Sequence, residues 1–455
     1  MKKKRVLSLF LAAMLSLTAI TGCSGSGKTA DSQAAGSEGA TQAAGAGEKK
    51  ALKVWLEKVF SDDAIASLQK RVEQFAAEKG VDVQFEFLSA TDFVPKLNAA
   101  IEAGSNIPDI TLTSGNRALN YYPNIPNMDV TELVAEINSE RPYFDSVFEG
   151  AKYDGVNYFV PFLSSTCLMF VRTDILKENG ITEYPKTWDE VFTVAEKVSD
   201  PANGIYGLGI GCGPTDEDCE NTFRTILWNY GAYLFDEEGN AAVPNDRTKA
   251  LIEKYADLYK KEIIPPSATT WDPGGNNATY LMGESAIVFN APTLYNALKS
   301  DEAYKEIFEN TAALNMPDGT DNSQRMGFIT GWSVMSSCKD TDTAKDFIKY
   351  MLDKEWQDSY LEITAPVFAP LFKDAKENEF WKEGVNAQVV AYAENAGGYY
   401  GYPSKTLEGK VVGNKHYFTY PVAELLNSVV TGASTPDKAM EKMKADIEEI
   451  SASIK

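Results

Sequence analysis

Histidine is nearly absent from this chain, since His416 is the only one among 455 residues. Zinc sites of the Cys/His kind and Ser-His-Asp hydrolases both depend on histidine in company with other ligands or acids. Basic residues are also few, with 43 Lys and Arg against 65 Asp and Glu and a formal net charge of −22. Phosphate binding relies on clustered Lys and Arg. We therefore expect no metal, no cofactor, no catalytic residue and no nucleic acid partner.

Long hydrophobic runs are absent beyond the N-terminus. Residues 2–5 are basic, and residues 6–20 form an apolar run that stops at the small residues Thr21 and Gly22. This run is shorter than the roughly 20 apolar residues that a membrane-spanning helix needs. The arrangement is typical of a secretory signal, and we assign residues 1–22 to a signal peptide.

The segment that ends the signal resembles a bacterial lipobox, Ile20-Thr21-Gly22-Cys23. The resemblance implies cleavage before Cys23 and attachment of a lipid, such as palmitate, to its sulfur. Residues 24–50 contain no Val, Ile, Leu, Met or aromatic residue, so they cannot bury themselves and should form a flexible tether. This favours a lipoprotein over an ordinary signal peptide with a chance cysteine. We expect residues 23–50 to be a lipidated tether on the extracellular face of the cytoplasmic membrane.

Four cysteines remain after Cys23, and two of them lie close in sequence. Cys212 and Cys219 could close a short loop as a disulfide in an extracellular compartment. Two free buried thiols are the equally weighted alternative.

The first part of the body shows alternating strand and helix patterns. Residues 52–60 are an apolar strand candidate, and Ser61 can cap a helix that Gly80 ends. Residues 81–87 alternate as a strand, a second helix closes at Gly104, and residues 110–112 form a third short strand. Strand, helix, strand, helix, strand predicts a parallel sheet in an α/β domain.

Helices are predicted further along by their start signals and apolar spacing. Thr187 and Glu190 have the spacing of a capping box ahead of a helix. Residues 344–351 carry apolar side chains at helical spacing, and Thr435-Pro436 opens a last helix. The C-terminal third should therefore be rich in helix.

Several short strings stand in a characteristic order along most of the chain. The strings are Asn106-Ile107-Pro108-Asp109-Ile110, the hairpin at residues 153–162, Tyr184-Pro185-Lys186-Thr187-Trp188-Asp189-Glu190, and residues 231–240, 282–290 and 331–334. Taken together, they resemble the family 1 extracellular solute-binding proteins that serve bacterial ATP-driven importers, chiefly of sugars. The loop from Cys212 to Cys219 departs from the family pattern.

The resemblance implies a periplasmic-binding-protein-like fold: two α/β lobes joined by a hinge, with the ligand held in a central cleft. We place lobe one at residues 51–160 plus 286–335 and lobe two at residues 161–285 plus 336–455. The implied partners are a carbohydrate, most simply an oligosaccharide, and the permease subunits of an ABC importer. A monomer that contacts the membrane only through its lipid is expected.

Polar side chains that follow predicted strands are the first candidates for the binding site, because open parallel sheets bind ligands beyond the carboxyl ends of their strands. Hydroxyl, amide and charged groups at these positions can hydrogen-bond to sugar hydroxyls. The candidates are Glu57, Lys58, Thr113, Ser114, Asn116, Ser164 and Ser165.

Aromatic side chains are the second group of candidates, because sugar C–H patches stack on ring faces. Trp271 lies in a turn-rich loop, and Trp332 follows Gly331 in a segment expected to cross between lobes. Trp228 and the tyrosine cluster that contains Tyr400 are second choices. Asn290, which ends the string at residues 282–290, completes the predicted site. Each aromatic has a packing role as its alternative.

Two other functions stay open from the sequence. A surface glycoside hydrolase would need two carboxylates that flank one bond, and the many acids in the chain allow such a pair. A binder of peptides, polyamines or another non-sugar solute could use the same scaffold.

Overall fold

The computed structural model describes residues 50–58 and 61–455. The predicted signal peptide, the lipidation site Cys23 and the predicted tether up to residue 49 therefore lie outside the described residues. Across the described ranges, the helices are too short or too polar for any of them to span a bilayer.

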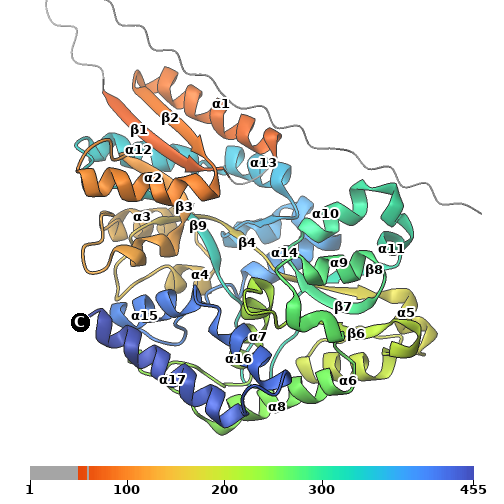
Figure 1. Cartoon of the computed structure of the whole chain (residues 1–455). Coiled ribbons are helices and arrows are strands. Elements are labelled where there is room, and N and C mark those ends of the chain that lie inside the picture. Colours follow the sequence, from red (N-terminus) through yellow and green to blue (C-terminus); the bar gives the residue numbers. More distant parts are fainter. Residues whose placement is uncertain (1–49, 59–60) are drawn as a thin grey trace, which may run out of the picture. The chain divides into compact units, whose positions relative to one another are not determined.

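The larger of the two sheets formed by the described strands has the order β10–β4–β9–β3–β1–β2. Strand β1 pairs in parallel with β2 and with β3, whereas β9 runs antiparallel to both β3 and β4 (Figure 1). The strands are β1 (Ala51–Glu57), β2 (Asp82–Leu88), β3 (Ile110–Ser114), β4 (Val160–Ser165), β9 (Phe328–Val334) and β10 (Phe368–Ala369).

The predicted strand-helix-strand-helix-strand start is confirmed. Helix α1 (Asp62–Lys79) begins after Ser61, whose side chain accepts a hydrogen bond from the backbone N–H of Ala64. It ends at Gly80, whose φ of +67° is a left-handed conformation that suits glycine. Helix α2 (Ala90–Ala103) follows β2. Both connections lead back to a parallel strand because parallel pairing needs a crossover of this length.

The smaller sheet has the order β6–β7–β5–β8, with β6 parallel to β7 and the other pairs antiparallel. Its strands are β5 (Leu168–Arg172), β6 (Tyr206–Gly209), β7 (Ser285–Asn290) and β8 (Thr311–Leu314). The chain passes from the larger sheet to this one through Thr166 and Cys167 and returns through residues 315–327 (Figure 1).

Helices cover both sheets. The predicted capping box is confirmed at the start of α6, where Thr187 and Glu190 bond reciprocally. The predicted helices near residue 344 and after Thr435 are confirmed as α12 and α17. The remaining α-helices with these three are α3 (Thr131–Glu140), α4 (Asp145–Gly150), α5 (Thr173–Glu178), α6 (Trp188–Val198), α7 (Glu217–Asn229), α8 (Asp246–Lys260), α9 (Gly275–Leu281), α10 (Thr293–Ser300), α11 (Lys305–Glu309), α12 (Thr341–Met351), α13 (Lys354–Thr364), α14 (Gly384–Ala393), α15 (Leu407–Tyr417), α16 (Pro421–Val430) and α17 (Pro436–Ser453).

Short 3-10 helices occupy several connections. They are η1 (Gly115–Tyr121), η2 (Pro201–Asn203), η3 (Pro266–Thr270), η4 (Glu302–Tyr304), η5 (Lys373–Glu377) and η6 (Glu379–Trp381). Only η1, directly after β3, contributes to the site described below.

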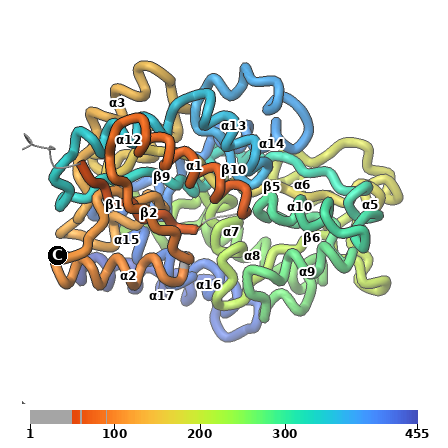
Figure 2. Tube along the Cα trace, turned by 90° about the horizontal axis from the view of Figure 1, so that it is seen from above, coloured from red at the N-terminus to blue at the C-terminus, as the bar shows by residue number. Residues whose placement is uncertain are grey.

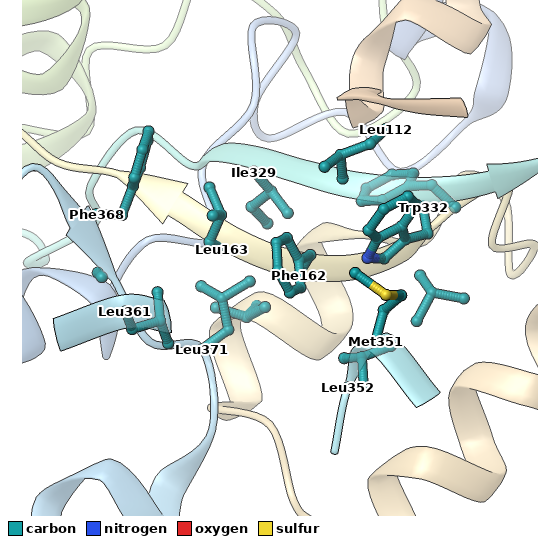
Figure 3. Packing of buried hydrophobic residues seen from close by; sticks show 14 of the residues in the cluster. Leu112, Phe162, Leu163, Ile329, Trp332, Met351, Leu352, Leu361, Phe368 and Leu371 are labelled. Carbon is teal, nitrogen blue, oxygen red and sulfur yellow. The ribbon is translucent and has the colours of Figure 1, made fainter. Parts of the chain in front are cut away.

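Two large hydrophobic cores pack against the sheets: the first holds the larger sheet and also Leu168 and Phe170 of β5, and the second lies on the smaller sheet. Trp332 of β9 is fully buried in the core of the larger sheet, close to Met351 of α12 (Figure 3). Trp188 and Phe289 pack in the core of the smaller sheet. In α15, Val411 belongs to the first core and the next residue, Val412, to the second. This helix therefore links the two halves of the described chain.

Strand pairing groups two segments differently from the predicted lobe boundaries. Strands β7 and β8, which fall within the range predicted for lobe one, pair with β5 in the smaller sheet. Helices α12 and α13, in the range predicted for lobe two, pack on the core of the larger sheet. Figure 2 shows β1 and β2 toward one end of the molecule and β5 and β6 toward the other. The difference arises because the sequence pattern of a strand does not indicate which sheet it joins, and only tertiary contacts decide it.

Candidate ligand-binding site

A cavity of about 220 Å³ lies between the larger sheet and the segments around α15. The carboxyl ends of β1 and β3, with η1 after β3, form one side, and the loop after α14 together with α15 forms the other. The lining residues are Glu57, Ser114, Asn116, Arg117, Leu119, Gly150, Tyr153, Phe159, Ser165, Gly327, Phe328, Ile329, Thr330, Gly397, Gly398, Tyr399, Tyr400, Lys410 and Asn414.

An ion pair fixes the carboxylate at the end of β1. The Arg117 guanidinium donates to Glu57 from Nη2 at 2.6 Å and from Nε at 3.2 Å. Thr113 Oγ1 donates to the same carboxylate at 2.5 Å and accepts from Arg117 Nε at 2.7 Å. Bidentate pairs of this kind are geometrically specific. Glu57 is thus held as an acceptor at the cavity wall, with its charge balanced by Arg117.

Amide side chains connect η1 to α15 across the cavity. Asn116 donates to Asn414 at 3.1 Å, and Asn414 donates to Asn120 at 2.7 Å. Ser114 donates to the oxygen of Asn116 at 2.6 Å. Each amide offers both donors and acceptors, so this chain of groups can exchange its internal hydrogen bonds for bonds to a polar ligand.

Aromatic rings form the opposite wall. Tyr400 stacks on Tyr417 with ring centroids 3.6 Å apart and planes within 5°. Tyr399 and Tyr400 are half-buried, whereas Tyr153 and Phe159 are buried parts of the same lining. Ring faces of this kind can pack against the C–H surface of a ligand while their hydroxyls stay hydrogen-bonded.

Lys410 is a buried cation at the edge of the cavity, with only 5% of its surface exposed. Its ammonium donates to the backbone carbonyl of Lys152 and lies over the rings of Tyr399 and Tyr153, at 4.1 Å and 5.2 Å from the centroids. Burial lowers the pKa of Lys410 from 10.5 to about 8, and the nearby charges of Glu149 and Asp154 act in the opposite direction.

Two glycines allow the cavity floor to form. A Cβ atom on Gly150 would lie 2.6 Å from the carbonyl oxygen of Gly397. A Cβ atom on Gly398 would lie 2.5 Å from the carbonyl oxygen of Arg325 and 2.6 Å from the Trp228 ring. Trp228, a predicted stacking residue, is therefore a buried support beneath the floor rather than part of the lining.

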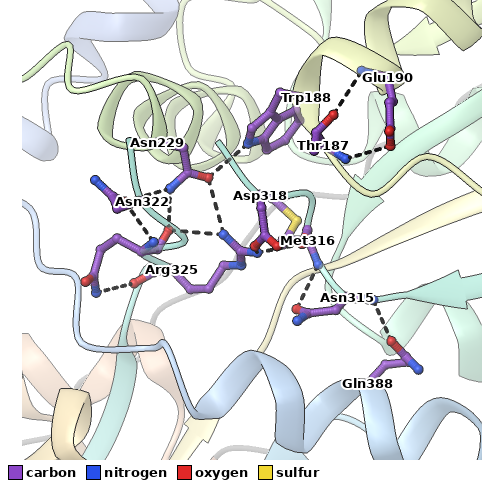
Figure 4. Close-up of polar contacts among 11 residues, drawn as sticks. Thr187, Trp188, Glu190, Asn229, Asn315, Met316, Asp318, Asn322, Arg325 and Gln388 are labelled. Atoms are coloured by element: carbon purple, nitrogen blue, oxygen red, sulfur yellow. Dashed lines mark hydrogen bonds and ion pairs between the residues drawn. The ribbon is translucent and has the colours of Figure 1, made fainter. Parts of the chain in front are cut away.

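A buried arginine positions the loop that leads into β9 (Figure 4). Arg325 donates from Nη2 to Asp318 at 2.8 Å and to the carbonyl of Met316 at 2.6 Å, and from Nη1 to Asn229 at 3.3 Å. The backbone N–H of Gly398 donates to the carbonyl oxygen of Arg325 at 2.9 Å. This network joins the segment before β9 to the loop after α14, so the two segments keep a fixed position relative to each other at the cavity.

The structure brings five of the twelve predicted ligand-binding residues to the cavity. These are Glu57, Ser114, Asn116, Ser165 and Tyr400. Thr113 does not line the cavity itself, but its hydroxyl donates a hydrogen bond to the lining residue Glu57.

Two further polar candidates lie outside the lining. Ser164 is fully buried and donates to the carbonyl of Ser165. Lys58 is exposed, and its backbone N–H donates to Leu88.

Three other predicted residues lie away from the cavity. Trp332 is part of the core of the larger sheet (Figure 3). Trp271 packs in the core of the smaller sheet, and its indole donates to Ser267 at 3.2 Å. Asn290 donates to Asp218 at 3.0 Å and to Asn276 at 2.9 Å. These side chains are occupied by packing or by internal hydrogen bonds.

Fourteen of the nineteen lining residues did not figure among the predicted ligand contacts, among them Arg117, Tyr399, Lys410 and Asn414. Arg117 follows Thr113 by four residues, so extending the search further past the strand end would have found it. Tyr399 belongs to the tyrosine cluster from which Tyr400 was taken. Lys410 and Asn414 come from a helix near the C-terminus, and no local pattern indicates that it returns to this site.

For Cys212 and Cys219, the sequence left open a disulfide or two free buried thiols. Cys212 and Cys219 are both buried, and both are free thiols in the structure. Burial raises the pKa of Cys212 to about 11, with a hydrogen bond from Tyr255 acting in the opposite direction. Among the described residues, no group of three or more His, Cys, Asp and Glu side chains is arranged to hold a metal ion.

The fold is that of the two-lobed α/β periplasmic binding proteins. Solved structures with this fold include maltose-bound MalE3 of T. maritima, at a TM-score of 0.67 and 20% identity over 88% of this chain and 99% of that one. The sugar-binding protein MalE of Xanthomonas citri matches at a TM-score of 0.72 and 16% identity over 89% and 98%.

The profile of the bacterial extracellular solute-binding protein family matches residues 61–358. The chain belongs to this family. Among its relatives, the diacetylchitobiose binding protein DasA of Streptomyces coelicolor is 27% identical over 380 residues, 78% of this chain and 80% of that one. The putative ABC transporter periplasmic-binding protein YcjN of Escherichia coli is 23% identical over 335 residues, covering 70% and 72%. By their names, the first binds diacetylchitobiose and the second is a putative binding protein of an ABC transporter.

Proposed function

We propose that the protein captures a carbohydrate outside the cytoplasmic membrane and delivers it to an ATP-driven importer. The observation that carries this proposal is the cavity itself, which joins hydroxyl-binding groups on one side to half-buried tyrosine rings on the other. Relatives and structural neighbours named for diacetylchitobiose, maltotriose and maltose support a sugar ligand.

The polar wall suits hydroxyl groups. Glu57 can accept from a sugar hydroxyl, and Asn116 and Asn414 can both donate and accept. The tyrosine wall suits the C–H face of a pyranose ring. A sugar ring presents both surfaces, because its hydroxyl groups lie around its edge and its C–H groups form its face.

The size of the site favours an oligosaccharide. The cavity of about 220 Å³ is smaller than the roughly 300–1,000 Å³ of a drug-sized binding site. A neighbouring groove of about 580 Å³ shares Gly150, Gly397, Tyr399 and Lys410 with the cavity. One sugar unit inside the cavity and further units along the groove account for both spaces.

Capture is favoured over hydrolysis by the carboxylates of the site. Glycosidases use two, separated by about 5–10 Å. Within the described residues, Glu57 is the only Asp or Glu that lines the cavity, and both of its oxygens accept from Arg117. We therefore propose a binder without catalytic residues.

The test is a screen of neutral and acidic di- and oligosaccharides against the full-length protein by thermal shift, with chromatography of the sugar afterwards. A ligand at 100 times its Kd should stabilise the protein by about 2.7 kcal/mol, and the sugar should be recovered intact. Cleaved sugar would establish the hydrolase. Stabilisation only by peptides or polyamines would establish a non-sugar binder.

A variant pair assigns the binding to this cavity. Glu57→Gln removes the charged acceptor and should weaken binding of a stabilising sugar by about 10–100-fold. Glu86→Gln is the control, since Glu86 is a carboxylate on the edge strand β2 that pairs with Lys96 away from the cavity. Equal binding by both variants would move the site elsewhere.

The lipid anchor at Cys23 is part of the proposal. Such an anchor would hold the body, as a monomer, near the permease subunits on which the ligand-bound form docks. Replacing Cys23 with Ser should release the protein from the membrane fraction into the medium. Retention of the variant in the membrane fraction would argue against lipidation at this residue.

A further inference from the structure

The charges that line the cavity do not balance. Within the described residues, the charged lining side chains are Glu57, Arg117 and Lys410. Glu57 and Arg117 neutralise each other in a bidentate pair. Lys410 is left as a positive charge with no opposite charge in the lining.

Within the described part of the chain, no carboxylate forms an ion pair with Lys410, although Glu149 and Asp154 line the groove beside it and are close enough to raise its pKa. No Asp or Glu of the described residues lies within the 4.0 Å ion-pair distance of its ammonium. Glu149 approaches from α4 but pairs with Lys152 at 2.8 Å. Asp154 is exposed in the turn that follows. A buried cation normally has an ionic partner, because its desolvation is otherwise uncompensated.

The contacts that Lys410 does make leave donors free. Of its three N–H groups, one donates to the carbonyl of Lys152, and the rings of Tyr399 and Tyr153 supply cation–π contacts. Such contacts attract the charge, but they offer no acceptor to the remaining N–H groups. Lys410 is also the only lysine among the described residues that is buried.

The position of Lys410 relates it to the ligand path. It lines both the cavity and the neighbouring groove, together with Gly150, Gly397 and Tyr399. An acidic group at the junction of the two spaces would meet the free donors of this ammonium.

We propose that the ligand is an acidic saccharide, whose carboxylate or sulfate ester pairs with Lys410 at the junction between the cavity and the groove. This inference rests on the proposed carbohydrate-binding function and names the substrate class for the same site. The pair would form away from bulk solvent, where salt screens its attraction little. The repulsion between an acidic ligand and a chain with a net charge of −22 acts over longer distances through solvent and is screened more.

The experiment compares matched ligands by calorimetry on the full-length protein. Digalacturonate is compared with its dimethyl ester, which keeps the rings and the linkage but carries no charge. A sulfated disaccharide is compared with its unsulfated form, so the two pairs distinguish a carboxylate from a sulfate. We expect the acidic member of at least one pair to bind about 10–100-fold more tightly than its neutral member.

Three variants assign the preference to this residue. Lys410→Met keeps the apolar stem and should bind both members of the pair equally, whereas Lys410→Arg should retain the preference. Lys415→Met is the control, because Lys415 is exposed on the same helix. A melting temperature for each variant shows that it is folded.

Each failure has a separate meaning. Neutral sugars that bind as tightly as acidic ones would overturn the acidic-ligand inference and leave the proposed function intact. A preference for acidic sugars that survives in a folded Lys410→Met variant would overturn the role of Lys410. Absence of binding by any sugar, acidic or neutral, would overturn the proposed function itself.

Discussion

At the scale of single residues, Trp332 shows how a large aromatic that was predicted to bind ligand can serve packing alone. It is fully buried on β9, and its ring packs edge-on against Phe347 of α12 and beside Phe162 of β4. Its indole nitrogen is buried without a hydrogen-bond partner in the structure. The ring therefore contributes by its volume and not by recognition.

Replacing Trp332 should change stability and not ligand affinity. Trp332→Ala should lower the free energy of unfolding by about 3–5 kcal/mol because it opens a cavity in the core. Trp332→Phe should cost less, about 1–2 kcal/mol, since it keeps much of the ring and removes an unpartnered donor. Urea denaturation measures the loss, and calorimetry measures the affinity. A tenfold weaker affinity in the folded Phe variant would place Trp332 in the site after all.

At the scale of an element, helix α7 begins with a carboxylate that is also buried. Asp216 is 2% exposed and accepts a hydrogen bond from the backbone N–H of Cys219 at 3.0 Å as the N-cap. Burial is the largest cause that raises the pKa of Asp216 from 3.8 to about 7, and the charges of Asp218 and Asp272 also raise it. The Asp216 side chain therefore stabilises the start of the helix as its cap, but the burial of its ionised carboxylate lowers the stability of the folded protein.

The stability of the protein should therefore fall as Asp216 ionises. Its folded pKa lies above its unfolded pKa, so the folded state binds more protons between pH 4 and pH 7 and loses stability as the pH rises. Asp216→Asn keeps a capping oxygen and should be more stable than the wild type at pH 8 by about 1–3 kcal/mol. Little difference is expected at pH 4. Urea denaturation at the two pH values measures both.

A second N-cap aspartate supplies the control. Asp340 caps α12 by accepting from the backbone N–H of Thr343. Its pKa is lowered, chiefly by hydrogen bonds from Thr343. Asp340→Asn should therefore be no more stable than the wild type at pH 8, in contrast to Asp216→Asn. The same gain in both variants would show that the effect is general charge relief in an acidic protein.

At the scale of the whole described chain, the two sheets share structural elements. Helix α14 contacts β10 of the larger sheet and β5 and β8 of the smaller one. Helix α15 contributes Val411 to one core and Val412 to the other, and its Asn414 bonds to Asn116 and Asn120 in η1. Neither sheet therefore has a complete core without the segments that join them.

We expect the two halves to unfold together. Far-ultraviolet circular dichroism reports on all helices, whereas tryptophan fluorescence reports on indoles in both cores, among them Trp188 and Trp332. The two signals should follow one urea transition with the same midpoint. Two separated midpoints would show that the halves are independently stable and that α14 and α15 couple them only weakly.

The start of the larger sheet was predictable because its signals are local. Ser61 and Gly80 bound α1 by capping chemistry, and the strands between the helices alternate or are continuously apolar. The same local logic found Glu57, Ser114 and Asn116, since each lies at the carboxyl end of a strand or just after it. It could not find Lys410, because nothing near that residue encodes the contact with Tyr153 and Lys152.

The sequence by itself determined the alternation of strands and helices, the helix caps and the strand-end residues of the site. Its strings also indicated the solute-binding family. Only the tertiary structure decided that β7 and β8 join the smaller sheet, that Trp271 and Trp332 serve the cores, and that α15 returns to close the cavity. The physical reason is range: caps and periodicity act over a few residues, whereas strand partners and the second wall of the site depend on contacts between segments hundreds of residues apart.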